Sequence, residues 1–258
     1  MNSLMSKYPF TFFLLFAFVI ISILRFIGSN LFFSEEWNTI ITESILIVLL
    51  LIFISYTKSF SIFQFDFKSF FSGLAYGWYP IIIALFMLIT HINKFDEITL
   101  FTLFLLIISN FLVGAFEEIF CRGIIFKNLL NYYSPIKSGI LSALIFSLAH
   151  IVNFFSDSEP FEVISQILYA FFLGILFAAI YYKTKNIWTV ILLHAFIDFS
   201  ASLIEIPDSN VSEAAVKFSQ LDSIIVAITN ILIVLPALLI GLYYFKKFKP
   251  LRPNKSLK

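Results

Sequence analysis

Long apolar runs separated by short polar stretches repeat along almost the whole chain. A helix needs about 20 apolar residues to cross a bilayer, and eight segments are long enough or nearly so. They lie at about 9–28, 39–56, 70–90, 98–116, 136–154, 163–182, 187–204 and 223–245, and the fourth is expected to continue as a helix to about Leu130. Pro80 and Pro236 fall inside segments and are expected to kink them. The pattern predicts an all-α polytopic membrane protein with about eight transmembrane helices, in one integral membrane domain covering 1–258.

Composition supports this class of protein. Apolar residues make up 60% of the 258 residues and charged residues 13%, whereas a soluble domain is nearer half apolar and a quarter charged. The net charge of +1 argues against a nucleic-acid partner. The single Cys121 excludes an intramolecular disulfide and a cysteine-rich metal site. The 35 Phe, with many Ile, Asn and Lys, are typical of an AT-rich genome and favour a bacterial source.

The loops between the apolar segments differ in the sign of their charge. Lysines and arginines concentrate in the C-terminal tail and around 58–68, 127–137 and 183–185, whereas acids concentrate around 35–36, 96–97, 157–162 and 205–213. The positive-inside rule places the basic loops in the cytoplasm. We therefore expect a plasma-membrane protein with both termini cytoplasmic and with the acidic loops outside.

Among the ionisable side chains within the apolar segments, we select six as the candidates for function: Glu117, Glu118, Arg122, His150, His194 and Asp198. An ionisable group at the bilayer centre costs about 3 kcal/mol or more, so it persists where it is paired or functional. Glu118 and Arg122 are four residues apart and can pair on one helix face. His194 and Asp198 have the same spacing, and Phe146 lies one turn from His150. Glu117 points about 100° away from Glu118 and stays outside that pair.

Helix lengths predict the depth of these residues. Glu117 and His150 lie 16 and 17 residues from a hairpin turn near Tyr133, so both come level at roughly 24–26 Å from it. His194 lies only about 10 Å from the start of its own helix. This mismatch closes if the stretch after Glu118 tilts or the hairpin dips below the bilayer. We then expect one cavity within the membrane, open to the cytoplasm.

A carboxylate beside a histidine can take a proton from water, and a second histidine can donate a hydrogen bond to an oxyanion. Three short motifs carry such residues: E-E-x-x-x-R at 117–122, F-x-x-x-H at 146–150 and H-x-x-x-[N/D] at 194–198. In this order and spacing they resemble the CPBP intramembrane proteases, also called the Abi or CAAX-protease-like family. The resemblance covers about 110–199, which we interpret as the catalytic core.

The resemblance implies an intramembrane endopeptidase in which Glu117 activates water with help from His150. It implies that His194 and Asp198 stabilise the tetrahedral intermediate. Asp198 stands where many members carry Asn, and an ionised carboxylate would repel an oxyanion. Asp198 must therefore be neutral, orient His194 or bind a metal.

The motifs also carry residues with supporting or open roles. Glu118 and Arg122 resemble a structural or substrate-positioning pair, and a buried pair that only fixes helix packing is an equal alternative. Phe146 is assigned to the same positioning group. Cys121 replaces a residue that is often aromatic, and we assign it no nucleophilic role without a partner base on the same helix face.

Zinc is an alternative to a metal-free site. His150, His194 and Glu117 could supply nitrogen and oxygen ligands and leave one position open. Members of the family are described both as metalloproteases and as metal-free, glutamate-dependent enzymes. We favour the metal-free mechanism, with no certain cofactor, because one carboxylate and two histidines can perform the hydrolysis.

The expected substrate is a hydrophobic peptide or a membrane-protein segment, cleaved near the cytoplasmic leaflet of the bilayer. Related proteins are associated with bacteriocin immunity, peptide maturation and membrane signalling. The alternative function is a non-proteolytic immunity or peptide-binding protein that uses the same cavity. A transporter fits less well because the chain has no internal repeat. The sequence leaves the oligomeric state open.

Overall fold

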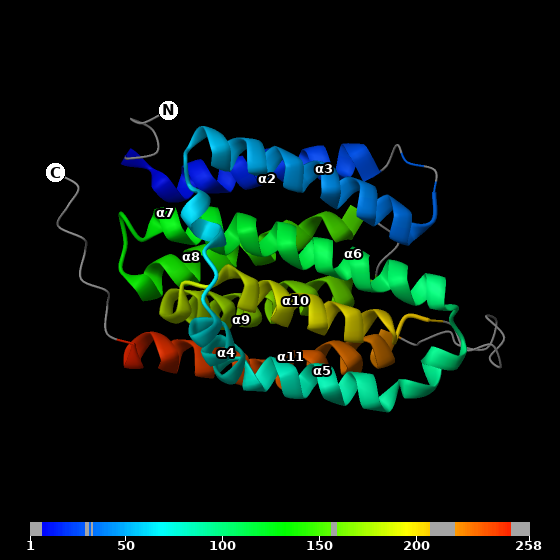
Figure 1. Cartoon of the computed structure of the whole chain (residues 1–258). Helices are drawn as coiled ribbons and strands as arrows, with labels where there is room; N and C mark the ends of the chain where they lie inside the picture. The colour runs from blue at the N-terminus through cyan, green and yellow to red at the C-terminus, as the bar shows by residue number, and fades with distance from the viewer. Residues whose placement is uncertain (1–6, 29–30, 32, 156–158, 207–219, 249–258) are drawn as a thin grey trace.

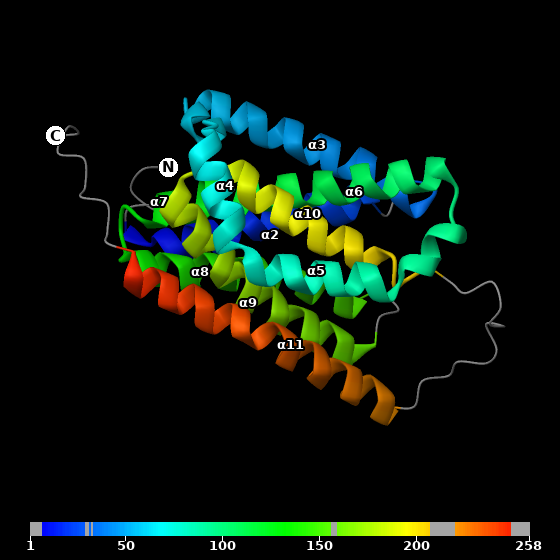
Figure 2. The same cartoon turned by 60° about the horizontal axis from the view of Figure 1, so that its bottom comes forward.

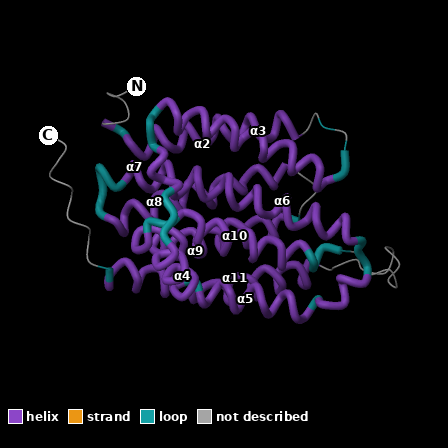
Figure 3. Tube along the Cα trace, viewed as in Figure 1, coloured by secondary structure: helices purple, strands orange, loops and turns teal. Residues whose placement is uncertain are grey.

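The computed structural model describes residues 7–28, 31, 33–155, 159–206 and 220–248, and every element in those residues is a helix (Figure 3). Five helical runs are long and apolar enough to cross a membrane: α3 (Glu35–Tyr56), Leu100–Leu129, Pro135–Phe155, α9 (Pro160–Thr184) and α11 (Gln220–Lys247). The predicted class, an all-helical polytopic membrane protein, is therefore confirmed.

The remaining three predicted segments are helical too, but they are shorter or bent. α2 (Pro9–Gly28) and α10 (Ile187–Ser202) are the shorter apolar helices. α4 (Phe67–Tyr76) and α5 (Trp78–Thr90) are apolar enough for one span when taken together, but they meet at 67°. All eight predicted segments are thus helical, while eight complete crossings stay a prediction.

The bend between α4 and α5 falls at Gly77, just before Pro80. Proline has no N–H, so Pro80 cannot bond the carbonyl oxygen of Tyr76 four residues earlier. That oxygen accepts instead from the Tyr244 hydroxyl on α11, at 3.2 Å. The kink expected from Pro80 is present, whereas α11 runs unbroken through Pro236.

The helices form one bundle in which α9 is central (Figures 1 and 2). α9 packs against α11 on one side and against α8 (Pro135–Leu148) on the other. α10 packs against both α5 and α6 (Leu100–Glu118), and α3 packs along α6. The site residues belong to α6, α8 and α10 or to their direct continuations, so they lie inside the bundle.

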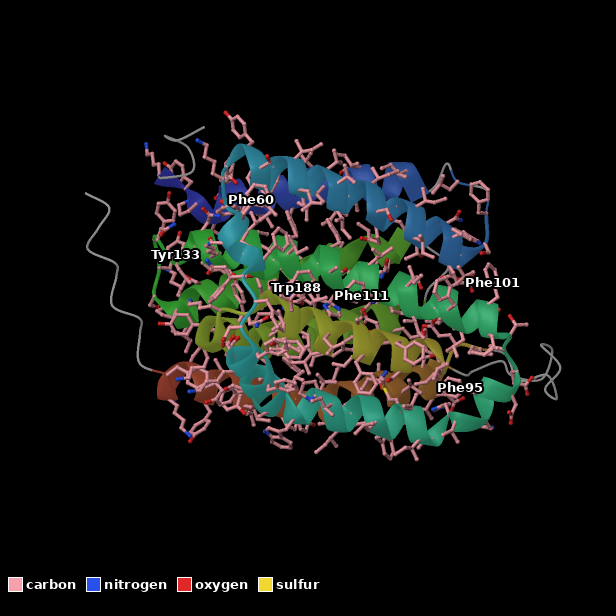
Figure 4. All side chains as sticks on the ribbon, viewed as in Figure 1. Phe60, Phe95, Phe101, Phe111, Tyr133 and Trp188 are labelled. Carbon is pink, nitrogen blue, oxygen red and sulfur yellow. The ribbon has the colours of Figure 1, made fainter. Side chains whose placement is uncertain are left out.

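The two ends of the bundle differ in charge. α2 begins and α11 ends at the same end, on the left of Figure 1, where Figure 4 shows Tyr133. We call this the basic end because its loops and helix ends carry Lys58, Lys127, Lys137 and Lys185. The opposite end, with Phe95 and Phe101 in Figure 4, is the acidic end and carries Glu35, Glu36, Glu97 and Glu205. The predicted separation of charge is present; which end faces the cytoplasm stays a prediction.

α6 and α10 approach closely at Gly114. A Cβ atom built there would lie 3.0 Å from the backbone nitrogen of Ala195 and 3.1 Å from the carbonyl oxygen of Ile191. Glu117 lies on the next turn of α6, and Ala195 follows His194 directly. The glycine therefore allows the two helices to approach until these two motifs meet.

We expect Gly114→Ala to lower the midpoint of thermal unfolding, because the added methyl group meets backbone atoms that cannot rotate away. Overpacking of this kind costs about 1–3 kcal/mol. Gly28→Ala in α2 is the matched control, since a Cβ there meets nothing within 4 Å. Equal midpoints for the two variants in detergent would contradict the close approach.

Candidate active site

The E-E-x-x-x-R motif lies where an α-helix changes into a π-helix. Glu117 and Glu118 end α6, and Arg122 lies in the π-helix η3 (Ile119–Phe126), whose eight residues are all buried. The F-x-x-x-H motif ends in a similar change, because His150 lies in the 3-10 helix η4 (Ala149–Phe155) that follows α8. Such departures from α-helix are frequent at functional sites. They alter the direction of the side chains relative to straight helices.

Glu118 is the fully buried centre of a charged group. Its Oε1 accepts from Arg122 Nη1 at 2.6 Å and lies 2.9 Å from His194 Nδ1. The predicted pair of Glu118 and Arg122 therefore exists, and both side chains have no exposed surface. Because Glu118 also contacts His194, it links the first motif to the third.

Arg122 is held by two further helices, α8 and α9, as well as by Glu118. Its Nη2 donates to the carbonyl oxygen of Gly174 on α9 at 3.2 Å. Its guanidinium carbon lies 4.6 Å from the ring centroid of Phe146 on α8 and 5.7 Å from that of Phe177 on α9. Such cation–π contacts are favourable where the cation is desolvated. Arg122 thereby ties the π-helix to α8 and α9 beneath the site.

The other nitrogen of His194 faces two carboxylates. His194 Nε2 lies 3.3 Å from Glu117 Oε2 and 3.2 Å from Asp198 Oδ2. The side chains of Glu117 and Asp198 are 24% and 30% exposed, whereas that of Glu118 is fully buried. The mismatch in depth expected for His194 is thus closed, and Glu117 and Asp198 are the carboxylates that can meet a substrate.

His150 reaches this group through an aromatic ring. The Phe146 ring packs edge-to-face on His150 with centroids 5.5 Å apart, and on His194 at 5.8 Å. No hydrogen bond recorded for the described residues joins His150 to Glu117, and the imidazole that contacts Glu117 belongs to His194. His150 still interacts electrostatically with Asp198 and His194.

The predicted zinc ligands do not converge as a metal site requires. Among the described residues, no group of three or more His, Cys, Asp or Glu side chains is placed to hold a metal ion. Both ring nitrogens of His194 lie against carboxylate oxygens rather than facing a common point with His150. These donors do not fit zinc.

Glu43 on α3 is a buried carboxylate that the sequence analysis missed. It is 7% exposed, and its Oε2 is buried and makes no hydrogen bond within the described part of the chain. α3 packs along α6, and Glu43 interacts electrostatically with Glu117. The signal that could have found it is an acid inside the apolar segment 39–56, the same kind of signal that indicates Glu117.

The fold and the site define an integral membrane protein with a hydrogen-bonded group of carboxylates, an imidazole and a guanidinium between its helices. Residues 99–200 match a family model described as Type II CAAX prenyl endopeptidase Rce1-like. The match confirms the resemblance to the CPBP, or CAAX-protease-like, family and encloses all seven predicted site residues. CAAX-type intramembrane protease activity on hydrophobic substrates within a bilayer is what this family indicates. No curated protein and no solved structure matches the chain.

Proposed function

We propose that the protein is a glutamate-dependent intramembrane endopeptidase that hydrolyses a peptide bond in a hydrophobic peptide or a membrane-protein segment. The observation that carries this proposal is the continuous group from Glu117 through His194 and Glu118 to Arg122. Its inner half is fully buried, and its outer half is exposed enough to meet a substrate. A fixed imidazole beside an accessible carboxylate supplies both a base and a hydrogen-bond donor.

Glu117 is the general base in the first step. Its carboxylate takes a proton from a water molecule as the water oxygen bonds to the carbonyl carbon of the scissile peptide. The electron pair of the C=O bond moves onto oxygen, and the N–H at His194 Nε2 donates to that oxyanion. One such donor typically contributes a factor of about 10²–10³ to kcat. When the C–N bond breaks, Glu117 returns its proton to the leaving nitrogen.

Glu118 and Arg122 are positioning residues in this mechanism. The contact between Glu118 Oε1 and His194 Nδ1 at 2.9 Å fixes the direction of the imidazole. Arg122 offsets the charge of Glu118 at 2.6 Å and has no exposed surface through which to meet a substrate. Their burial supports a role in holding the site rather than in binding the peptide.

Asp198 orients His194 in this proposal, and His150 keeps the supporting role that the resemblance implies. The 3.2 Å contact with Asp198 Oδ2 aims Nε2 toward the exposed side of the site. A substrate carbonyl would then share or replace that contact. The electrostatic interaction of His150 with Asp198 and His194 supports a place for it beside the same reacting groups.

Asp198→Asn should keep kcat/KM within about tenfold of wild type, because an amide oxygen still accepts from Nε2 and the repulsion toward an oxyanion is gone. Asp198→Leu should lose more, since it removes the acceptor. The measurement is kcat/KM of both variants on one peptide. Equal losses in the two variants would mean that the negative charge itself is needed.

The function is tested with detergent-purified protein and a library of quenched fluorescent apolar peptides. We expect cleavage by wild type and by Glu159→Gln, which alters an exposed acid at the start of α9. Mass spectrometry of the products should show one new carboxyl and one new amino terminus. A folded wild type that cleaves no peptide in the library, in detergent or in liposomes, would count against the protease.

A further inference from the structure

A cavity of about 400 Å³ lies between α3, α6 and α10 at the acidic end of the bundle. Most of the side chains that line it are polar, including Thr39 on α3, Ser109 and Asn110 on α6, and Ser202 on α10. On α6 its lining extends from Thr102 to Val113, which is roughly 16 Å along the helix axis. The cavity is therefore long, lined mostly by polar residues and parallel to the helices.

The helix faces that line this cavity carry a carboxylate one turn deeper: Glu43 on α3, Glu117 on α6 and Asp198 on α10. Residues four apart lie on the same face of a helix, about 6 Å further along its axis. Thr39 is followed in this way by Glu43, and Val113 by Glu117. On α10, which runs in the opposite direction, Ser202 is preceded by Asp198. All three helices thus lead from the cavity to the site.

Two buried polar atoms lie beyond the deep end of the cavity and call for polar partners. Thr42 Oγ1 and Glu43 Oε2 make no hydrogen bond among the described residues, although their residues are only 5% and 7% exposed. A buried polar atom left without a partner loses its hydration without compensation and destabilises the fold. Water is the usual partner of such atoms when the site is polar and roomy.

The cavity and the site also share one electrostatic environment. Glu43 interacts with the charge of Glu117. At the mouth of the cavity, burial raises the pKa of Glu205, and its neighbours Glu35, Asp198 and Glu162 raise it further. Lys94 also reaches this rim, where its ammonium donates to the carbonyl oxygen of Ile206 at 2.7 Å. Among the described residues at the mouth, the carboxylates of Glu35, Glu36 and Glu205 outnumber this cation, so the entrance favours positive charge.

We propose that the cavity is the outer part of a hydrophilic passage that brings water from the acidic end to Glu117, and that Glu43 is the positioning residue that holds this water at its inner end. The claim that the passage supplies water for hydrolysis rests on the proposed function. The claim that the passage is hydrated can be tested without that function. With the orientation expected from the charges, it opens on the outer side, so the opening differs from the cytoplasmic one expected from the sequence.

The passage is tested by cysteine accessibility, for which this chain is well suited. Its only cysteine, Cys121, is buried, so Cys121→Ala gives a background without thiols. Single cysteines replace Thr39, Val113 or Ser202, and Phe111→Cys is the control. Phe111 lies two residues from Val113 on α6 and is 40% exposed, but it lines an apolar groove. The purified proteins in phosphatidylcholine–phosphatidylglycerol liposomes are treated with charged methanethiosulfonates.

We expect the three passage cysteines to react about tenfold or more faster than Phe111→Cys, because only a hydrated thiol ionises readily to the reactive thiolate. The cationic reagent should react faster than the anionic one, and Glu35→Gln with Glu36→Gln should reduce that preference. Rates at all three positions no higher than at Phe111, in folded proteins, would overturn the passage. Labelling with no peptide cleavage would support the passage and count against the proposed function instead.

The role of Glu43 needs a second readout. Glu43→Leu should lower kcat about tenfold or more with little change in KM, because it disturbs the water and not the peptide. Glu43→Gln, which can still hold water, should recover most of that loss. If the leucine variant leaves kcat unchanged, or if both variants change KM alone, Glu43 has no part in positioning water.

Discussion

Glu117→Gln should reduce peptide cleavage about a thousandfold while the protein stays folded and membrane-inserted. Glutamine keeps the size of the side chain but cannot take a proton from water, and general bases contribute about 10²–10⁴-fold. The contact between Glu118 and His194 does not involve Glu117, so the imidazole should stay in place. The measurement is kcat on the best peptide of the library.

Glu118→Gln tests whether the two adjacent carboxylates have different roles. The two carboxylates are adjacent in the sequence, yet Glu117 is 24% exposed and Glu118 is fully buried. We expect Glu118→Gln to act mainly on stability and on the direction of His194, whereas Glu117→Gln should leave the midpoint of thermal unfolding near that of wild type. A Glu117→Gln variant that cleaves at the wild-type rate would remove Glu117 from the mechanism.

The helices and the local pairs could be predicted because they depend on near neighbours in the chain. Apolar length alone indicates all eight helical segments, and four-residue spacing indicates the contacts of Glu118 with Arg122 and of His194 with Asp198. The bend at Gly77 follows from Pro80 in the same local way. These features need no knowledge of which helix packs on which.

The rest of the site depends on contacts between distant helices and on departures from α-helical geometry. Neither spacing nor periodicity predicts that His194 meets Glu118 from α10. The π-helix after Glu118 and the 3-10 turn at His150 change side-chain directions that straight helices would fix. As a result, the imidazole expected beside Glu117 was that of His150, and the contact belongs to His194.

Glu43 could not be assigned to the site from the sequence for a different reason. The acid was visible within an apolar segment, but no motif accompanies it, and only the packing of α3 along α6 relates it to Glu117. The direction of the cavity could not be predicted either, because its lining comes from three helices that are far apart in the sequence. Charge patterns orient the bundle, but they do not tell at which end a cavity opens.

Arg122→Met should destabilise the protein by about 3–5 kcal/mol, because it leaves the Glu118 carboxylate buried without its cation. Methionine retains apolar volume beside Phe146 and Phe177, so loss of packing is a minor part of the effect. The guanidinium also loses its bond to the carbonyl oxygen of Gly174. The measurement is the thermal unfolding midpoint in detergent, which should fall by several degrees at least.

Combining Arg122→Met with Glu118→Gln distinguishes the loss of charge compensation from the loss of the arginine's packing and hydrogen bonds. The double variant has no carboxylate at position 118, so it should be more stable than Arg122→Met alone. The unfolding of wild type, both single variants and the double variant together gives the coupling of the pair. It should still cleave poorly, because a neutral amide holds His194 Nδ1 less firmly than a carboxylate does. If the double variant is as unstable as Arg122→Met, the arginine stabilises the fold through α8 and α9, and not by compensating Glu118.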